Sequence, residues 1–351
     1  MNSHPLLAGL RQNPDYFLQN LDLVNRRGLV VHIDQKIYRQ AAFLDERMFT
    51  SDIQGAWFPL DTLLQATVGL PTRATQYLFH IGHCGSTLLS RLLAELPGCF
   101  ALREPLAFLA LAMTQRELGL PNSRLDAGSW QDLFKMVSDL QARCYTDSDT
   151  ALIKSTSVAG NLLQPVLATQ PDARAILLYM HLEPWLATML RAPGTRESVR
   201  SFAGAWLTDF RQLTGDMSVE LHALDDVRQA VIGWAAMLLN FTRAATHDPA
   251  RTHWLNFDEF LTAPVSHCKA VADFLGLPAS DAKIEALLAG PIMGHYAKDP
   301  SQSFDTNVRT RELSEARQRF ETEIGTGLQW FEELTQRIPA LSELGPGASR
   351  S

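Results

Sequence analysis

The feature that most constrains the fold is a turn with two glycines between an apolar run and a leucine-rich segment. Residues 76–81 form the apolar run, which is suited to a strand buried on both faces. The turn reads His80-Ile81-Gly82-His83-Cys84-Gly85-Ser86-Thr87, and leucines then recur at helical spacing as far as Pro97-Gly98. Glycines let main-chain N–H groups face inward, and a helix N-terminus carries partial positive charge. The sequence therefore predicts a strand, an anion-binding turn and a helix.

Further apolar runs, separated by helical patterns, predict buried strands at residues 99–102, 151–153, 175–180 and 253–257. A helix is expected to begin at Pro184, and another at Pro264 that ends at Gly276. Strands that alternate with helices are typical of a parallel sheet with helices on both faces. We therefore expect an α/β fold of the P-loop type, with ligands at the carboxyl ends of the strands.

The main α/β domain is expected over residues 73–340, because the first buried strand begins after the linker-like segment 71–73. Residues 1–72 are then an N-terminal extension or small subdomain, and 341–351 a flexible tail. Long helical patterns at 195–252 predict a helical insertion or lid over the sheet edge. Its aromatic residues are expected in the core rather than around a cofactor: Trp206, Phe210, Trp234 and Phe241.

Composition limits the kind of partner. A formal net charge of -7 over 351 residues disfavours nonspecific binding to nucleic acid or to an anionic membrane, so an anionic ligand needs a local site. Apolar stretches fall short of the ~20 residues that a membrane span requires. The cysteines have neither metal-ligand spacing nor the pattern of a disulfide framework: Cys84, Cys99, Cys144 and Cys268. We expect a cytoplasmic protein without a metal site; the sequence does not indicate the oligomeric state.

The turn resembles the phosphate loop of the sulfotransferase family, which reads approximately Pro-Lys/Arg-Ser-Gly-Thr-Thr/Ser-Trp/Leu-Leu. Further blocks similar to the family follow in order, and together they cover roughly residues 76 to 335: 102–105, 152–155, 170–178, 256–264 and 274–278. The resemblance implies 3'-phosphoadenosine 5'-phosphosulfate as a co-substrate and no metal. It also implies transfer of the sulfuryl group to a hydroxyl or amine of a small-molecule acceptor.

The resemblance further implies roles for individual residues. Glu104 is expected to act as a general base, because several family branches place a carboxylate there, while Lys154 and His83 neutralise the transferring group. A branch that uses a catalytic His has it where this chain has Thr156, so that base is excluded. The loop is expected to hold the 5'-phosphate through Gly82, His83, Cys84, Gly85, Ser86 and Thr87.

The sequence departs from the family pattern in two segments, the phosphate loop and the segment that holds the 3'-phosphate. His83 stands where the loop usually carries Lys or Arg. The Arg-Asp-Pro and the Ser that normally hold the 3'-phosphate correspond here to Leu182-Glu183-Pro184 and Leu190. Arg191, Arg196 or Arg200 could take over the 3'-phosphate, with Arg191 as the leading candidate. Weaker candidates, in a late segment that could close over the donor, are Lys298 and Arg309.

Other interpretations of the site residues stay open. Glu104 could pair with Arg103 or cap a helix, Lys154 could extend to the surface, and Cys84 could serve packing alone.

Two other functions are also open. A P-loop small-molecule kinase is one, although its loop motif, GxxxxGK[ST], would need Gly at His80 and Lys at Ser86. The other is a sulfotransferase-like module that binds without catalysis, as the changed 3'-phosphate positions suggest.

Overall fold

A computed structural model describes residues 4–296, 299–303 and 306–345. Its centre is a five-stranded parallel sheet with the strand order β5-β6-β4-β7-β8. The strands are β4 (Thr75–His80), β5 (Cys99–Arg103), β6 (Thr150–Lys154), β7 (Arg174–Tyr179) and β8 (Thr252–Asn256). The predicted α/β class and all five predicted strands are therefore confirmed, to within one residue at each end.

The register of the sheet brings several polar residues to one edge. Along β4, Leu78 is paired with Lys154 at the end of β6, and His80 with Leu178 of β7. Arg103, at the end of β5, is paired with Lys154 as well. Because the strands are parallel, the residues that follow them gather at the same carboxyl edge. The phosphate turn, Glu104 and Lys154 thus come from three adjacent strands.

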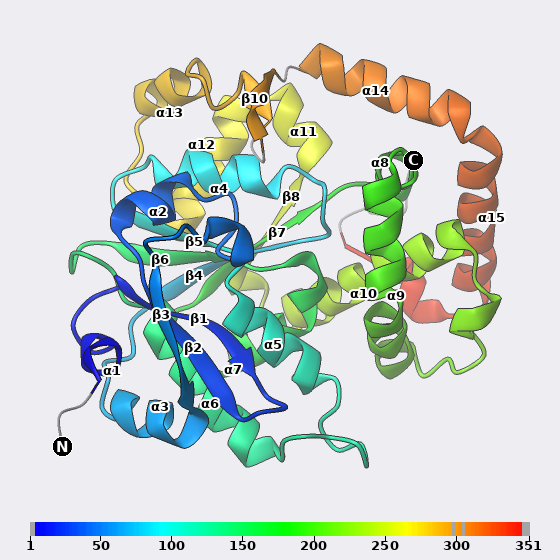
Figure 1. The fold of residues 1–351 in the computed structure, drawn as a ribbon. Coiled ribbons are helices and arrows are strands. Elements are labelled where there is room, and N and C mark those ends of the chain that lie inside the picture. Colours follow the sequence, from blue (N-terminus) through cyan, green and yellow to red (C-terminus); the bar gives the residue numbers. More distant parts are fainter. Residues whose placement is uncertain (1–3, 297–298, 304–305, 346–351) are drawn as a thin grey trace.

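Helices cover both faces of the sheet (Figure 1). One face carries α4 (Ser86–Ala94) and α12 (Pro264–Leu275), and α12 ends at Gly276 as predicted. The other carries α5 (Leu106–Gln115), α6 (Ala127–Gln141) and α7 (Leu163–Thr169). The helix expected from Pro184 is α8 (Leu182–Leu190) and begins two residues earlier. Shorter elements are η2 (Ser157–Leu162), α11 (Phe257–Thr262), α13 (Asp281–Leu288), β9 (His295–Tyr296) and β10 (Asp299–Ser303).

The predicted helical insertion consists of two long helices, α9 (Pro193–Thr214) and α10 (Asp226–His247). Its four aromatic residues, Trp206, Phe210, Trp234 and Phe241, are each at most 2% exposed, which places them in the core. Two further helices, α14 (Thr306–Arg319) and α15 (Glu321–Arg337), follow along the outside of α8. Among the described helices, none combines the length and the apolar character needed to cross a bilayer.

The N-terminal region contains a separate antiparallel sheet that the sequence patterns did not predict. It consists of β1 (Tyr16–Asp22), β2 (Arg27–His32) and β3 (Gln54–Pro59), with α1 (Pro5–Gly9), α2 (Gln35–Gln40), η1 (Glu46–Met48) and α3 (Leu60–Thr67) around it. Its apolar side chains join the main core, so this region packs on the α/β domain (Figure 1). Buried Arg143 strengthens the junction by donating to the carbonyls of Leu10, Asn13 and Tyr16.

The predicted flexible tail is wrong for residues 341–345. A 3₁₀ turn covers Pro339–Glu343, Leu341 is 0% exposed and Leu344 is 2% exposed. The Gly345 amide also donates to the Thr242 hydroxyl of α10 at 3.0 Å. Two buried leucines and this hydrogen bond hold a segment whose Gly and Ser content had suggested fraying. Residues 346–351 lie outside the described residues.

A buried ion pair joins α5 to α9. Arg116 donates to both carboxylate oxygens of Asp209 at 2.7 Å, and both side chains are 4% exposed. Removing one partner leaves the other charge buried without compensation. We predict that Asp209→Ala lowers the free energy of unfolding, measured in urea, by about 3–5 kcal/mol. The double variant Arg116→Met/Asp209→Leu should lose much less, and a loss under about 1 kcal/mol in Asp209→Ala would contradict this role.

Candidate active site

Three residues of the phosphate turn, two of them consecutive, have backbone φ angles in the left-handed region. Gly82 has φ 79°, His83 has φ 52° and Gly85 has φ 74°. Glycine adopts this conformation freely, whereas a residue with a Cβ adopts it at a cost in free energy. His83 is therefore held in a strained conformation, which is common at functional sites. The turn reverses the chain between the end of β4 and the start of α4.

The first part of the turn is fastened from both sides. The Gly82 amide donates to His80 Nδ1 at 2.9 Å, and the indole N–H of Trp185 reaches the carbonyls of Ile81 and Gly82 at 3.1 and 3.2 Å. These groups are thus occupied within the protein. In contrast, the amides of Gly85, Ser86 and Thr87 show no acceptor in the part of the chain that the structure describes. They lie at the N-terminus of α4, where a helix favours an anion.

Gly85 is required by a close contact as well as by its φ angle. A Cβ added here would lie 1.9 Å from Cε2 of Phe257, the first residue after β8. The ring therefore covers the turn from the far side, and Arg309 of α14 lies over that ring at 5.1 Å from its centre. The loop, the end of β8 and α14 are in this way packed against one another.

Other loop side chains contribute little to an exposed surface. Cys84 is fully buried and its Sγ lies 3.6 Å from the Leu178 carbonyl, which fits the packing role left open above. Ser86 and Thr87 are 4% and 2% exposed, and the Thr87 hydroxyl is buried without a hydrogen-bond partner among the described residues. The anion-binding groups that the loop offers are therefore mainly main-chain amides. His83 is the exposed side chain of the turn.

Glu104 and Lys154 form a pair across neighbouring strands. Lys154 is 0% exposed and its Nζ donates to Glu104 Oε1, while the Glu104 amide donates to the Lys154 carbonyl at 2.7 Å. Glu104 also has a positive φ of 54°, directly after β5. The alternative pairing with Arg103 does not form, since Arg103 turns to the carbonyls of Tyr38, Arg39 and Ala41. Lys154 does not extend to the surface either.

A cavity of about 380 Å³ lies where these groups meet. It brings together His83 and Glu104, which the sequence placed in one site, and Lys154 lies beneath Glu104. The N-terminal region supplies one wall and α9 another. The lining residues are Phe43, Asp45, Arg47, His80, Ile81, Gly82, His83, Glu104, Leu106, Leu109, Thr156, Ser157, Met189, Ser198, Phe202 and Trp206.

Charges that line this cavity are compensated in pairs. Arg47 pairs with Asp45, and its guanidinium lies 3.8 Å from the centre of the Phe43 ring. Partial burial raises the pKa of Asp45, but hydrogen bonds from Arg47 outweigh it and leave the pKa below its usual value. The same hydrogen bonding raises the pKa of Arg47, and attraction to Glu104 adds to the rise. Phe43 also lies 5.6 Å from Lys154 Nζ.

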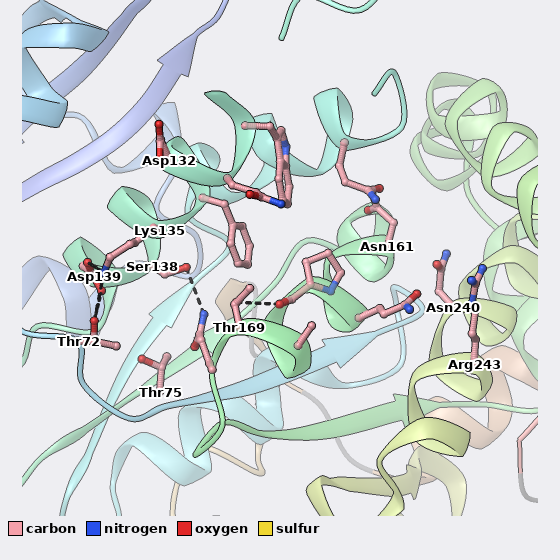
Figure 2. A pocket seen from close by; sticks show the side chains of 18 of the residues that line it. Thr72, Thr75, Asp132, Lys135, Ser138, Asp139, Asn161, Thr169, Asn240 and Arg243 are labelled. Atoms are coloured by element: carbon pink, nitrogen blue, oxygen red, sulfur yellow. Dashed lines mark hydrogen bonds and ion pairs between the residues drawn. The ribbon is translucent and has the colours of Figure 1, made fainter. Parts of the chain in front are cut away.

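A larger cavity of about 820 Å³ lies at the opposite end of the sheet, beside Thr75 at the start of β4 (Figure 2). Polar groups on one side of it are bonded to one another: the Lys135 ammonium and the Thr72 hydroxyl both donate to the Asp139 carboxylate. Asn161, Asn240 and Arg243 lie on its other side. Parallel sheets bind their ligands at the carboxyl ends of the strands, so the smaller cavity is the candidate active site.

The arginines proposed for the 3'-phosphate all have acidic partners. Arg191 pairs with Glu312 of α14, while Arg196 and Arg200 both pair with Asp226 of α10. Arg191 follows the last residue of α8, about 13 Å along the helix axis from its start at a rise of 1.5 Å per residue. Lys298 lies outside the described residues.

Arg309 is more deeply buried than the sequence suggested. It is 9% exposed, pairs with Asp258 and lies over the Phe257 ring that covers Gly85. From the sequence it was a weak candidate, for which a solvated surface position was the favoured interpretation.

Other site residues gave no signal in the sequence. Phe43 and Arg47 come from a segment far from the loop in sequence, and only packing of the N-terminal region brings them to the cavity. Trp185 was readable only as a core residue of an apolar helix. His80 was noted as a missing glycine, whereas its ring has a partner at each nitrogen.

Comparisons with known proteins give similarity of fold alone. No protein-family model matches the chain, and no curated protein matches it either. Among solved structures, the sulfotransferase domain from the curacin biosynthetic pathway is 17% identical, with a TM-score of 0.44 and coverage of 71% of this chain and 98% of that one. The chain is similar in fold to sulfotransferases.

Two further structures illustrate the range. The sulfotransferase domain of the Synechococcus olefin synthase is 16% identical, with a TM-score of 0.40 and coverage of 70% of this chain and 96% of that one. Mouse sulfotransferase SULT7A1, crystallised with PAP, is 13% identical, with a TM-score of 0.37 and coverage of 77% and 91%. Identities and TM-scores this low transfer no activity, so the function depends on the geometry of the site itself.

Gly85 and Gly276 separate backbone strain from steric overlap. Both have positive φ, 74° and 72°, but a Cβ at Gly276 would have nothing within 4 Å. We predict that Gly276→Ala costs about 1 kcal/mol of unfolding free energy, from strain alone. Gly85→Ala should cost at least ~2 kcal/mol more, because Phe257 has to move. Urea unfolding of both variants measures the difference, and equal costs would show that the Phe257 contact is unimportant.

Proposed function

We propose that the protein transfers the sulfuryl group of 3'-phosphoadenosine 5'-phosphosulfate to a hydroxyl or amine of a small-molecule acceptor. One observation carries the proposal: a single cavity is lined by Gly82 and His83 of the phosphate turn and by Glu104, the ion-pair partner of Lys154. The turn offers an anion site, and the pair offers a proton acceptor together with a buried positive charge. Sulfuryl transfer needs both, since negative charge develops on oxygens around the sulfur.

The donor is expected to bind through main-chain groups. The amides of Gly85, Ser86 and Thr87 point along the start of α4, where the helix dipole favours the 5'-phosphate. The Gly82 amide is engaged by His80 and is not counted among these donors. His83 lines the cavity together with Gly82 and Glu104 and, in our proposal, contacts the transferring group.

Transfer then proceeds as an in-line displacement. Glu104 Oε1 is occupied by Lys154, which leaves Oε2 to accept the proton of the acceptor hydroxyl. The hydroxyl oxygen forms a bond to sulfur while the bond from sulfur to the 5'-phosphate oxygen breaks. The products are a sulfate ester and adenosine 3',5'-bisphosphate, with the proton on Glu104. Lys154 stabilises the carboxylate before transfer and the negative oxygens during it.

The walls of the cavity indicate the kind of acceptor. Its charges are already paired, Arg47 with Asp45 and Lys154 with Glu104. The remaining walls are largely apolar and aromatic: Phe43, Leu106, Leu109, Met189, Phe202 and Trp206. An unpaired ionic group on the acceptor would be desolvated here without a partner, at a cost in affinity. We therefore propose an uncharged acceptor with an apolar body.

Glu104→Gln tests the proposed base. Gln keeps an oxygen for Lys154 but cannot take a proton, so we predict a fall in the transfer rate of about 100-fold or more. Affinity for adenosine 3',5'-bisphosphate, measured by calorimetry, should change less than threefold. Exposed Glu95, at the end of α4, provides a control variant, Glu95→Gln, with unchanged activity.

Other outcomes would overturn the proposal. A wild-type protein that binds magnesium ATP and not the bisphosphate would favour the kinase alternative. Binding of the bisphosphate without transfer across a broad panel of uncharged alcohols, phenols and amines would favour a noncatalytic binding module.

Two arginines are proposed for the 3'-phosphate, Arg191 from its place after α8 and Arg309 from its place beside Phe257. We predict that Arg309→Gln weakens binding of adenosine 3',5'-bisphosphate at least tenfold, because a charge-assisted contact is lost. Binding of adenosine 5'-monophosphate should change less than threefold. The same measurement on Arg191→Gln decides between them. The control is Arg317→Gln: Arg317 lies in α14, as Arg309 does, but it is exposed and pairs with Glu183 of α8.

A further inference from the structure

His80 occupies the position where the chain leaves the central strand β4. It is 4% exposed, and both ring nitrogens have main-chain partners: Nδ1 lies 2.9 Å from the Gly82 amide and Nε2 lies 2.8 Å from the Ser155 carbonyl. One partner belongs to the phosphate turn and the other follows Lys154 at the end of β6. We infer that His80 is a positioning residue that couples the phosphate turn to the Glu104–Lys154 pair.

The hydrogen bonds determine the protonation state of the ring. An amide N–H can only donate, so Nδ1 must accept from Gly82 and carries no proton. A carbonyl oxygen can only accept, so Nε2 must carry the proton that Ser155 receives. His80 is therefore neutral, with its single proton on Nε2. Glu104 Oε1 lies 3.9 Å from Nε2, beyond hydrogen-bond distance, and this oxygen already accepts from Lys154.

The contacts of His80 continue into the catalytic pair. Ser155 is fixed at its other side, where its amide donates to the Leu78 carbonyl at 3.1 Å. Lys154 precedes Ser155, and its carbonyl receives the Glu104 amide. The bond from His80 therefore orients the peptide group between Ser155 and Thr156, one residue beyond the peptide group that follows Lys154. On the other side, it holds Gly82 at positive φ, from which the turn reaches the amides of Gly85 to Thr87.

A glycine at position 80 could not make either bond, and a lysine or an arginine could not accept from Gly82. The coupling therefore requires a neutral side chain with an acceptor and a donor on opposite sides. Its effect on transfer rests on the proposed function, whereas the protonation state of the ring does not.

Three substitutions separate the two bonds. Asn places an oxygen near the position of Nδ1 and can keep the Gly82 bond, Gln places a nitrogen near Nε2 and can keep the Ser155 bond, and Phe keeps the ring volume without either. We expect His80→Phe to weaken adenosine 3',5'-bisphosphate binding at least tenfold by calorimetry, with a further fall in kcat. His80→Asn should retain nucleotide affinity within threefold and lose kcat, and His80→Gln should show the reverse.

Thermal unfolding of each variant shows whether it is folded, so that loss of structure is not read as loss of coupling. A folded His80→Phe variant with unchanged nucleotide affinity and kcat would overturn the proposal. Equal losses in the Asn and Gln variants would likewise show that the two bonds have no separate effects.

The ring itself can be observed without any substrate. In protein with ¹⁵N-labelled histidine, two-dimensional NMR should show the His80 ring at neutral pH with a proton on Nε2 and none on Nδ1. A proton on Nδ1, or on both nitrogens, would contradict the inference. If the wild-type protein binds no nucleotide, the proposed function fails, and this measurement still decides the state of His80.

Discussion

The buried ion pair between Lys154 and Glu104 is the interaction on which the site depends. An ammonium with no exposed surface, at the end of an interior strand, is costly unless an anion lies beside it. Glu104 meets this requirement only because β5 and β6 are adjacent and in register, and because its backbone adopts a positive φ. The strand order and the strained residue thus have a common consequence: a carboxylate is held at the carboxyl edge after β5, with β6 between it and the turn that follows β4.

In the phosphate turn, buried uncharged peptide groups likewise have partners within the protein. The early peptide groups of the turn are bonded within the protein: the Ile81 amide to the Leu178 carbonyl, the Gly82 amide to His80, and the carbonyls of both residues to Trp185. The amides at the beginning of α4 remain for a ligand. This division explains how a loop without the usual Lys or Arg can still form an anion site: its donors are main-chain groups and the helix dipole, and the nearby positive charge belongs to β6.

Much of the framework was predictable from the sequence. Apolar runs of three to six residues predicted all five strands of the central sheet, since strands buried on both faces need such runs. The position of the turn after the first of these runs predicted the edge where the site lies. The N-terminal sheet was not predicted, because its strands alternate less regularly and their partners are set by packing. Burial of Leu341 and Leu344 was missed for a related reason: two isolated leucines in a polar tail have no periodicity.

The sequence by itself determined the order of strands and helices, the place of the glycine turn and the presence of Glu104 and Lys154 at strand ends. These are local properties, set by spacing and residue type. Only the tertiary structure decided that Glu104 pairs with Lys154 rather than Arg103, that Phe43 and Arg47 complete the cavity, and that Arg309 lies beside the ring covering Gly85. Each of these contacts either joins residues that are distant in the sequence or selects one of two nearby partners. The selection depends on which side chains lie within contact distance once the core has packed.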